Sequence, residues 1–277
     1  MRQSIRFFIL FASCFIHQSF GWANDALRAR FLNEAPEAWE RMVASQNQFQ
    51  VEVRETRWGT LNGEEVDSSK SEIRMKLKMN LPMFAIETFS YKSDSPLRFA
   101  FVRGKNYAFE LTRKRRESPL LVTRLGKDDA TRESFKEGNY AWRAIGASYE
   151  LWGQSLIALV KSPQFRIDQI EELNENGFDI IRVRFDCRDK NLVMQFIDAK
   201  IDLLPQFDWA LKSADFKATE QIHMEIDNEY HEPQNGKIEL KSYLRSKHVP
   251  VEKVKTFIRF DYDGVAYGPI SDSNFTL

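Results

Sequence analysis

The chain has 277 residues, with 40 basic and 40 acidic side chains, 43% hydrophobic residues and 13% aromatic residues. This balanced charge argues against a dedicated nucleic-acid binder, because such proteins usually carry a basic excess. Of the two cysteines, Cys14 falls in an N-terminal leader. Cys187 alone then remains, so an internal disulfide is excluded and stability must come from the hydrophobic core.

The first 23 residues have the pattern of a secretory signal peptide. Arg2 and Arg6 give a basic start, residues 7–16 are apolar, and Gly21–Ala23 fits the small-x-small site of signal peptidase. The apolar run is too short for the roughly 30 Å hydrocarbon core of a membrane. We therefore expect cleavage after Ala23, a mature chain over 24–277 with a net charge near −2, and a periplasmic or extracellular location.

Two alternatives for this leader stay open. Phe11-Ala-Ser-Cys14 resembles a lipoprotein cleavage box, which would anchor a lipidated Cys14 to a membrane. Phe11, however, stands where an aliphatic residue is usual, and the apolar core would shrink to residues 7–13. A third interpretation is an uncleaved leader that serves as an anchor. Beyond residue 24, no apolar run of the sequence is long enough to span a membrane.

Helical spacing of apolar residues predicts an N-terminal helix over 24–48, which Pro36 either kinks or splits. From Phe49 the apolar period changes to two, which indicates strands. The clearest strand is 73–79, because its apolar and basic residues alternate strictly and thus give one buried and one wet face. Further strands are predicted at 84–91, 97–103, 107–112 and 120–125.

The second half begins with a predicted helix over 148–161, capped by Ser148 and ended by Pro163. Strands are then predicted at 165–173, 178–187, 192–201, 209–218, 223–230, 237–244 and 253–262. The first two flank a four-residue hairpin loop over 174–177. We see neither an internal repeat nor a low-complexity linker, so the sequence predicts one α+β, mainly β domain over 24–277 after a signal peptide over 1–23.

The order of these elements resembles the LolA/LppX-like fold of bacterial envelope proteins over 25–262. Leu203–Leu211 resembles a turn-plus-strand segment of such proteins, and Ser271–Leu277 resembles the ends of uncharacterised secreted planctomycete proteins. The resemblance implies a curved antiparallel sheet, an open half-barrel of about eleven strands, with an N-terminal helix and one inserted helix. Its concave face would hold a lipid or a lipidated peptide, without enzyme activity. No signature aligns residue by residue, so no residue role carries over.

Two sets of residues are candidates for contact with lipid. Methionine is common on adaptable binding surfaces, which suggests a ligand-facing wall, although a plain core is the alternative. This wall comprises Ile73, Met75, Leu77, Met79, Phe99, Phe101, Phe109 and Leu111. The densest basic run is Arg113, Lys114, Arg115 and Arg116. It is expected at a hairpin tip, as a solvated turn or as a transient contact with the anionic headgroups of a membrane surface.

Motifs of catalysis are missing from the sequence, which has neither a G-x-S-x-G elbow nor a phosphate-binding loop. Outside the leader, His223, His231 and His248 form no zinc-binding spacing, and Asp261–Gly264 matches only the start of a calcium loop. We therefore expect no cofactor, no metal and no catalytic residue. An enzyme hypothesis would need His223, Glu225 and His231 to converge in a cleft.

Together these patterns predict a secreted or periplasmic non-enzymatic protein that holds an apolar or lipid ligand in a curved sheet. The alternative is an envelope structural or interaction protein with a filled core. A cavity of a few hundred cubic ångströms under the sheet would favour the ligand, and a close-packed interior would favour the scaffold. Nucleic acid is not an expected partner, and the sequence leaves the oligomeric state open.

Overall fold

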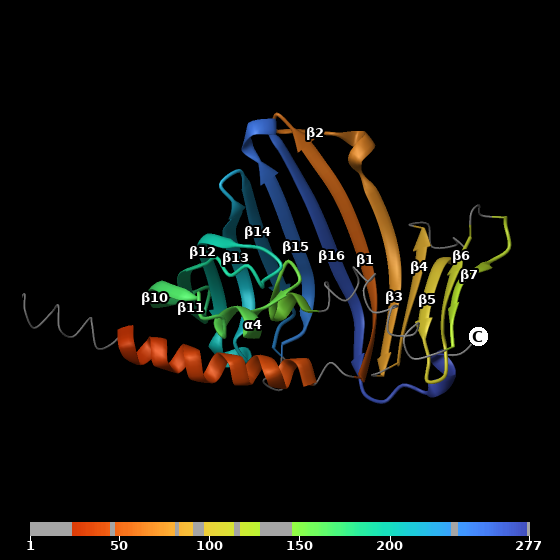
Figure 1. The fold of residues 1–277 in the computed structure, drawn as a ribbon, viewed down its shortest axis with the longest axis horizontal. Helices are drawn as coiled ribbons and strands as arrows, with labels where there is room; N and C mark the ends of the chain where they lie inside the picture. The colour runs from red at the N-terminus through yellow and green to blue at the C-terminus, as the bar shows by residue number, and fades with distance from the viewer. Residues whose placement is uncertain are drawn as a thin grey trace, which may run out of the picture.

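One curved antiparallel sheet dominates the protein (Figure 1). The computed structural model describes residues 24–44, 48–80, 83–90, 97–113, 117–127, 146–233 and 238–275. Within these ranges the sheet has 14 strands, more than the eleven or so expected, and it is not closed into a barrel. The predicted fold class, mainly β with an N-terminal and an inserted helix, is confirmed.

The strands form two meanders, one from each half of the chain. The first meander contains β1 (Gln48–Leu61), β2 (Glu64–Glu65), β3 (Ser71–Asn80), β4 (Met83–Ser90), β5 (Leu97–Arg103), β6 (Ala108–Thr112) and β7 (Leu121–Gly126). The second contains β10 (Arg166–Glu175), β11 (Phe178–Cys187), β12 (Phe196–Leu204), β13 (Ala210–Thr219), β14 (Ile222–Tyr230), β15 (Leu240–Val249) and β16 (Val254–Tyr267). Short 3₁₀ turns lie at Asp67–Ser69, Gly146–Ser148, Pro205–Phe207, Pro250–Glu252 and Asp272–Phe275.

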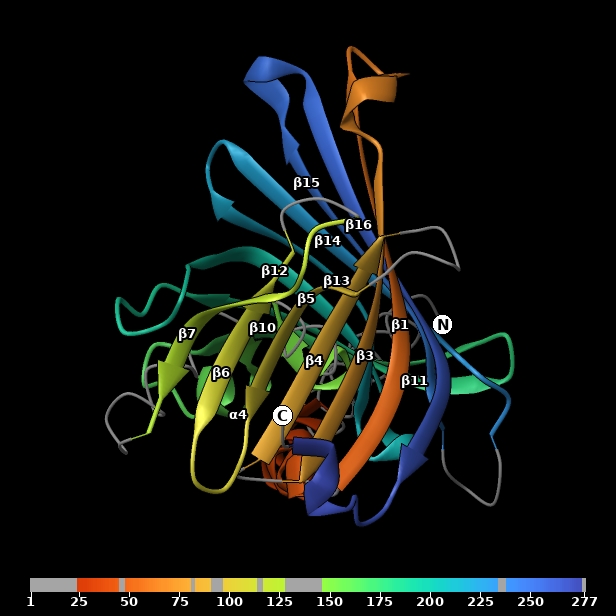
Figure 2. The same cartoon turned by 90° about the vertical axis from the view of Figure 1, so that its right-hand side faces the viewer.

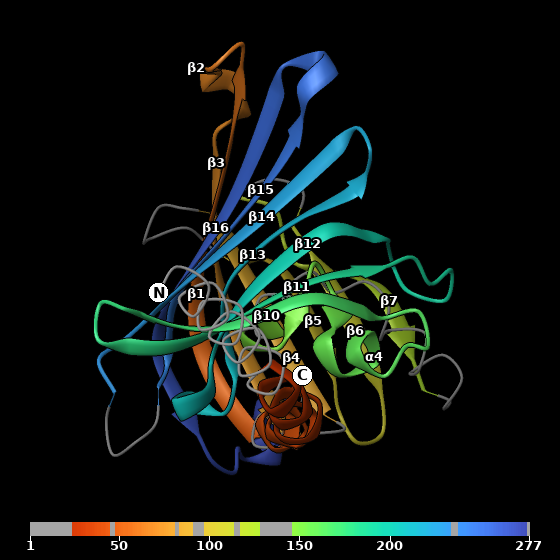
Figure 3. The same ribbon diagram turned by 90° about the vertical axis from the view of Figure 1, so that its left-hand side faces the viewer.

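The first and last long strands join the two meanders at the centre of the sheet. Strand β1 pairs with β16 from Phe49 opposite Tyr267 to Leu61 opposite Val254. The order across the sheet is β10 to β16, then β1, then β3 to β7, so β7 and β10 are its two edges. Figure 2 views the β3–β7 side and Figure 3 the β10–β13 side. The chain between Gly126 at the end of β7 and Arg166 at the start of β10 therefore connects the two opposite edges of the sheet.

The N-terminal helix spans residues 24–44 and is not split at Pro36, which lies buried inside it. Phe31, Ala35, Ala38 and Trp39 have no exposed surface, and they share one face of the helix at spacings of three to four residues. Pro36 removes one helical hydrogen bond, but the buried face around it packs the helix onto the sheet. Tertiary packing thus outweighs the local helix breaker.

The helix predicted over 148–161 is wrong in its extent. The structure has a small hairpin of β8 (Glu150–Leu151) and β9 (Gln154–Ser155), followed by the short helix α4 (Leu156–Val160). The hairpin turns at Trp152 and Gly153, whose φ angles are 53° and 83°, and such left-handed residues stop a helix. Ser148 lies in a 3₁₀ turn and caps no α-helix.

A second local correction concerns the hairpin between β10 and β11. Glu175 pairs with Phe178, so the turn has two residues, Asn176 and Gly177, instead of four. Their φ angles of 54° and 81° match the primed turn that Asn-Gly favours, because its twist suits the flanking strands.

The predicted signal peptide over 1–23 lies outside the described residues, and the single domain over 24–277 stays a prediction. Among the helices that the structure describes, none has the length and apolarity needed to cross a membrane.

Candidate ligand-facing surface

The face of the sheet that packs against the N-terminal helix, here called the inner face, is continuous and apolar across four strands. Leu77 of β3 lies opposite Val51 of β1 and Ile86 of β4, and Ile86 lies opposite Phe101 of β5. All four belong to one buried cluster together with Trp39 of the N-terminal helix. The alternation predicted for β3 is what places these side chains on a single face.

The predicted ligand-facing wall divides between the two faces of the sheet. Its members on the inner face are Ile73, Met75, Leu77, Met79, Phe99 and Phe101. Phe109 lies opposite Val102, and Leu111 lies opposite Ala100, so both are on the outer face. The structure therefore brings six of the eight together.

On the outer face, Phe109 contacts the protein's own C-terminal segment. It forms a separate buried cluster with Met83, Ala85, Val102 and Phe275, against which Leu111 also packs. The approach is close, because a Cβ on Gly104 would lie 2.6 Å from the backbone oxygen of Phe275. In this second cluster, the C-terminal segment of the chain thus covers the outer face of β4 to β6.

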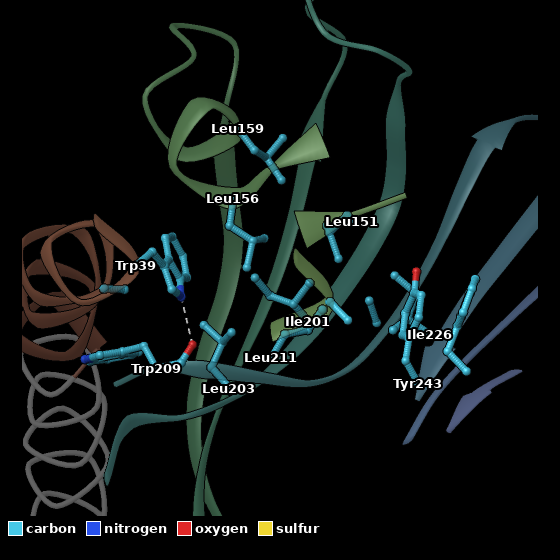
Figure 4. Packing of buried hydrophobic residues seen from close by; sticks show 14 of the residues in the cluster. Trp39, Leu151, Leu156, Leu159, Ile201, Leu203, Trp209, Leu211, Ile226 and Tyr243 are labelled. Atoms are coloured by element: carbon cyan, nitrogen blue, oxygen red, sulfur yellow. Dashed lines mark hydrogen bonds between the residues drawn. The ribbon is translucent and has the colours of Figure 1, made fainter. Parts of the chain in front are cut away.

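Next to β1, β3 and β4, the described side chains leave little free space. A cavity of about 10 Å³, room for about one water molecule, is lined by Phe49, Leu77, Lys78, Met79, Phe84, Ala85 and Ile86. On the β10–β16 side, Trp39, Leu156 and Leu159 pack over Leu203 and Leu211 (Figure 4). Such a cavity is far below the few hundred cubic ångströms of a ligand pocket.

Charged side chains also occupy the inner face, on the β2 side of the apolar rows. Glu55 of β1 is 3% exposed and forms an ion pair with Arg57. Arg245 of β15 is 5% exposed, and its guanidinium lies 4.6 Å from the ring centre of Trp152 and 5.7 Å from that of Phe260. The inner face is therefore apolar at the Phe49 end and charged at the other.

Beside Arg245, a group of uncharged polar side chains holds the segment before α4 to the sheet. Asn228 donates to the carbonyl oxygens of Ala147 and Leu211 at 2.9 and 2.7 Å. The Tyr230 hydroxyl also donates to Leu211 oxygen, at 2.6 Å, and burial raises its pKa. This tyrosine therefore stays neutral and offers no charge to an inner-face ligand.

The outer face carries the group that could best hold a metal ion among the described residues. Ligand atoms of Asp215, His223 and Glu225 lie within 4.8 Å of one another, and His223 Nε2 is 2.8 Å from Asp215 Oδ1. Glu225, however, is already paired with Lys255 at 2.7 Å. The three residues lie close together because β13 pairs with β14. The spacing of these residues in the sequence does not predict this.

The enzyme hypothesis placed His223, Glu225 and His231 in one cleft, and the structure does not bring them together. His223 lies near the start of β14, whereas His231 follows its end. At about 3.3 Å per residue, the two backbones are roughly 26 Å apart.

Only the first residue of the basic run is described. The backbone N–H of Arg113 donates to the carbonyl oxygen of Arg98 at 2.9 Å, directly after β6. Lys114, Arg115 and Arg116 lie outside the described residues, so a headgroup contact at this run stays a prediction.

Comparison with known proteins finds similarity in solved structures alone, since no protein-family model and no curated protein sequence matches the chain. A LolA superfamily protein from Nitrosomonas europaea is 12% identical, covers 88% of this chain and 98% of its own, and gives a TM-score of 0.45. A DUF1329 family protein from Desulfovibrio piger is 11% identical, covers 87% and 95%, and gives a TM-score of 0.44. The first belongs to the superfamily that the sequence resembles. Identities this low leave ligand and activity open, because side chains decide both.

Proposed function

We propose that the protein is a secreted or periplasmic, non-enzymatic binding protein that holds an apolar or lipid ligand against the inner face of its sheet. The observation that supports this most is the continuous apolar row across β1, β3, β4 and β5 in a sheet that is not closed. On either side of Leu77, the thioether side chains of Met75 and Met79 lie on the same face of β3. Methionine repacks easily, which suits a surface that must accept a flexible chain.

Binding must expand this part of the protein. A single acyl chain spans about 15 Å, half of the roughly 30 Å hydrocarbon core of a bilayer, whereas the cavity beside Leu77 and Met79 holds about 10 Å³. The ligand-bound state therefore has the sheet and the elements packed on it further apart. A ligand that binds only this expanded state draws the population toward it.

The test is uptake of a neutral acyl probe. We expect purified, delipidated protein to bind oleyl alcohol, detected as an added mass by native mass spectrometry. Leu77→Gln should weaken binding by roughly tenfold, because it sets an amide against the chain. Lys76→Gln is the matched control, since Lys76 lies on the outer face beside Glu52 and should leave uptake unchanged.

A second candidate function is an envelope interaction protein with a filled core. The small cavity and the complete burial of Leu156 and Leu159 favour it. It predicts that the wild-type protein takes up no acyl probe and that crosslinking in cells recovers a protein partner. Failure of wild-type protein to bind any acyl probe, neutral or anionic, would thus replace the first proposal with this one.

The proposed location depends on processing of the leader, which is directly measurable. We expect mass spectrometry of the protein recovered from its native envelope to find Asn24 at the N-terminus, because Gly21–Ala23 fits signal peptidase. A diacylated Cys14 would instead establish a lipoprotein, and an intact Met1 would establish an uncleaved anchor.

A further inference from the structure

Arg245 is a buried cation in an apolar setting. It is 5% exposed and lies between Ile226 of β14 and Ile258 of β16 in the register of the inner face. Transfer of a guanidinium from water into such a setting is costly unless an anion and hydrogen bonds compensate it. Arginine also does not lose its proton in proteins, so it cannot escape the cost by becoming neutral.

The described residues supply no such compensation. Arg245 makes neither an ion pair nor a hydrogen bond with any of them, and its buried Nε lacks an acceptor. Its contacts are with the rings of Trp152 and Phe260, at 4.6 and 5.7 Å. Ring faces attract a cation but accept no conventional hydrogen bond from it. The buried indole Nε1 of Trp152 has no acceptor among the described residues either.

The neighbouring charges do not neutralise Arg245. Glu55 is the acidic residue on the inner face nearest to it in register, but it lies opposite Phe260 and is paired with Arg57. Lys247, two residues along β15, adds a further positive charge on the same face, opposite Met224. Two buried donors and an excess of positive charge therefore meet at one place on the surface that would hold the ligand.

We propose that Arg245 and the Trp152 indole bind the anionic head group of an acyl ligand, whose chain lies along the inner face toward Phe49. This inference rests on the proposed function and specifies its ligand class as an anionic amphiphile. A carboxylate or a phosphate supplies the oxygen acceptors that both donors lack, and charge-assisted hydrogen bonds of this kind are short and strong.

The inner face has the right polarity and length for such a ligand. Arg245 lies opposite Ile258, and Ile258 lies opposite Arg57, so both arginines share one row across the sheet. From that row, β1 continues to Phe49 over about 26 Å at roughly 3.3 Å per residue. This exceeds the length of an acyl chain, about 15 Å as half of a bilayer core. A head group at Arg245 thus leaves room for the whole chain on the inner face, where the charge of Glu55 is already paired with Arg57.

The experiment compares probes that share a chain and differ in their head groups. Wild-type protein should bind oleate at least tenfold more tightly than oleyl alcohol, as measured by isothermal titration calorimetry. Arg245→Met should abolish that preference while retaining oleyl alcohol binding, and Arg245→Lys should retain part of it. Arg184→Met is the matched control, because Arg184 is exposed on the outer face of β11, and this variant should keep the preference. A parallel titration with phosphatidylglycerol distinguishes a phosphate from a carboxylate head group.

A measurement of thermal unfolding without ligand separates a loss of binding from a folding defect. Because Arg245 has no charge partner among the described residues, Arg245→Met should unfold at the same temperature as wild-type protein or higher. A lower unfolding temperature would overturn the proposal, since it would mean that Arg245 is already satisfied. Equal binding of oleate and oleyl alcohol by wild-type protein would overturn it too, while the proposed function stands. If neither probe binds, the proposed function fails, and this inference fails with it.

Discussion

Replacement of Trp39 by alanine is expected to lower the free energy of unfolding by about 3–5 kcal/mol. Trp39 has no exposed surface and meets the ring of Phe31 edge-on, with centroids 6.2 Å apart. Its indole Nε1 donates to the carbonyl oxygen of Trp209 at 2.8 Å, the bond drawn in Figure 4. The change therefore creates a cavity where the N-terminal helix meets the sheet and also leaves a buried carbonyl without its donor.

Urea denaturation followed by far-UV circular dichroism measures this effect. Trp39→Phe should lose only part of the stability, because it keeps the ring and removes the hydrogen bond. Leu32→Ala is the control on the same helix, since Leu32 is 39% exposed and a surface change of this kind costs little. A loss below about 1 kcal/mol for Trp39→Ala would show that the helix contributes little to the fold.

Removal of the Asp202 carboxylate is expected to cost about 3 kcal/mol, because it leaves the partly buried Arg182 with only its longer ion pair to Glu175, at 3.4 Å. Asp202 has a 6% exposed side chain and accepts two hydrogen bonds from Arg182, at 2.7 and 2.9 Å. Ser213 donates a third, at 3.0 Å. Asp202→Ala thus breaks a two-point ion pair that joins β11 to β12, and urea denaturation at neutral pH measures the loss.

The same carboxylate should contribute to acid sensitivity. Burial by itself raises the pKa of Asp202, but the hydrogen bond and charge of Arg182 outweigh it and lower the pKa below the usual 3.8. A lowered folded-state pKa gives stability that is complete above about pH 4, where the unfolded-state carboxyl titrates. This stability is lost as the pH falls through the folded-state value.

The difference in the free energy of unfolding between wild-type protein and Asp202→Ala should therefore be smaller at pH 3 than at pH 6. Asp208→Asn is the control, because its ion pair with Arg41 has side chains 58% and 63% exposed, and exposed pairs contribute little. A difference between wild type and Asp202→Ala that stays constant over this pH range would mean that the pair does not titrate as described.

The local periodicity of apolar residues predicted much of the fold. The alternation of Ile73, Met75, Leu77 and Met79 predicted β3 correctly, because one face of that strand is buried and the other is wet. Where backbone conformation overrode the apolar pattern, prediction was wrong. The leucines of 148–161 have helical spacing, but the left-handed turn at Trp152 and Gly153 divides the segment. Leu151 is therefore a buried residue of strand β8 and not of a helix.

The candidate site depends on which face of the sheet each side chain occupies and on where each strand ends. The periodicity of apolar residues along the sequence does not determine either. The inner and outer faces of β6 are both apolar, since Ala108 and Phe109 are each buried, so periodicity could not assign Phe109 to its side. Arg245 was missed for a simpler reason: the predicted strand ended at Leu244, one residue short of it. An arginine in step with the inward-facing Tyr243 is the sequence signal that would have found it.

The pairing of β1 with β16 has a consequence for how the protein is made. Each meander can fold as its own strands emerge during synthesis, because its hairpins join neighbours in the chain. The ladder between the meanders, however, joins strands at opposite ends of the described chain, and such distant contacts form slowly. Until β16 arrives, one long edge of β1 has no strand beside it, and an unpaired edge is a template for aggregation. The newly made chain is therefore most vulnerable at the strand that later lies at the centre of its sheet.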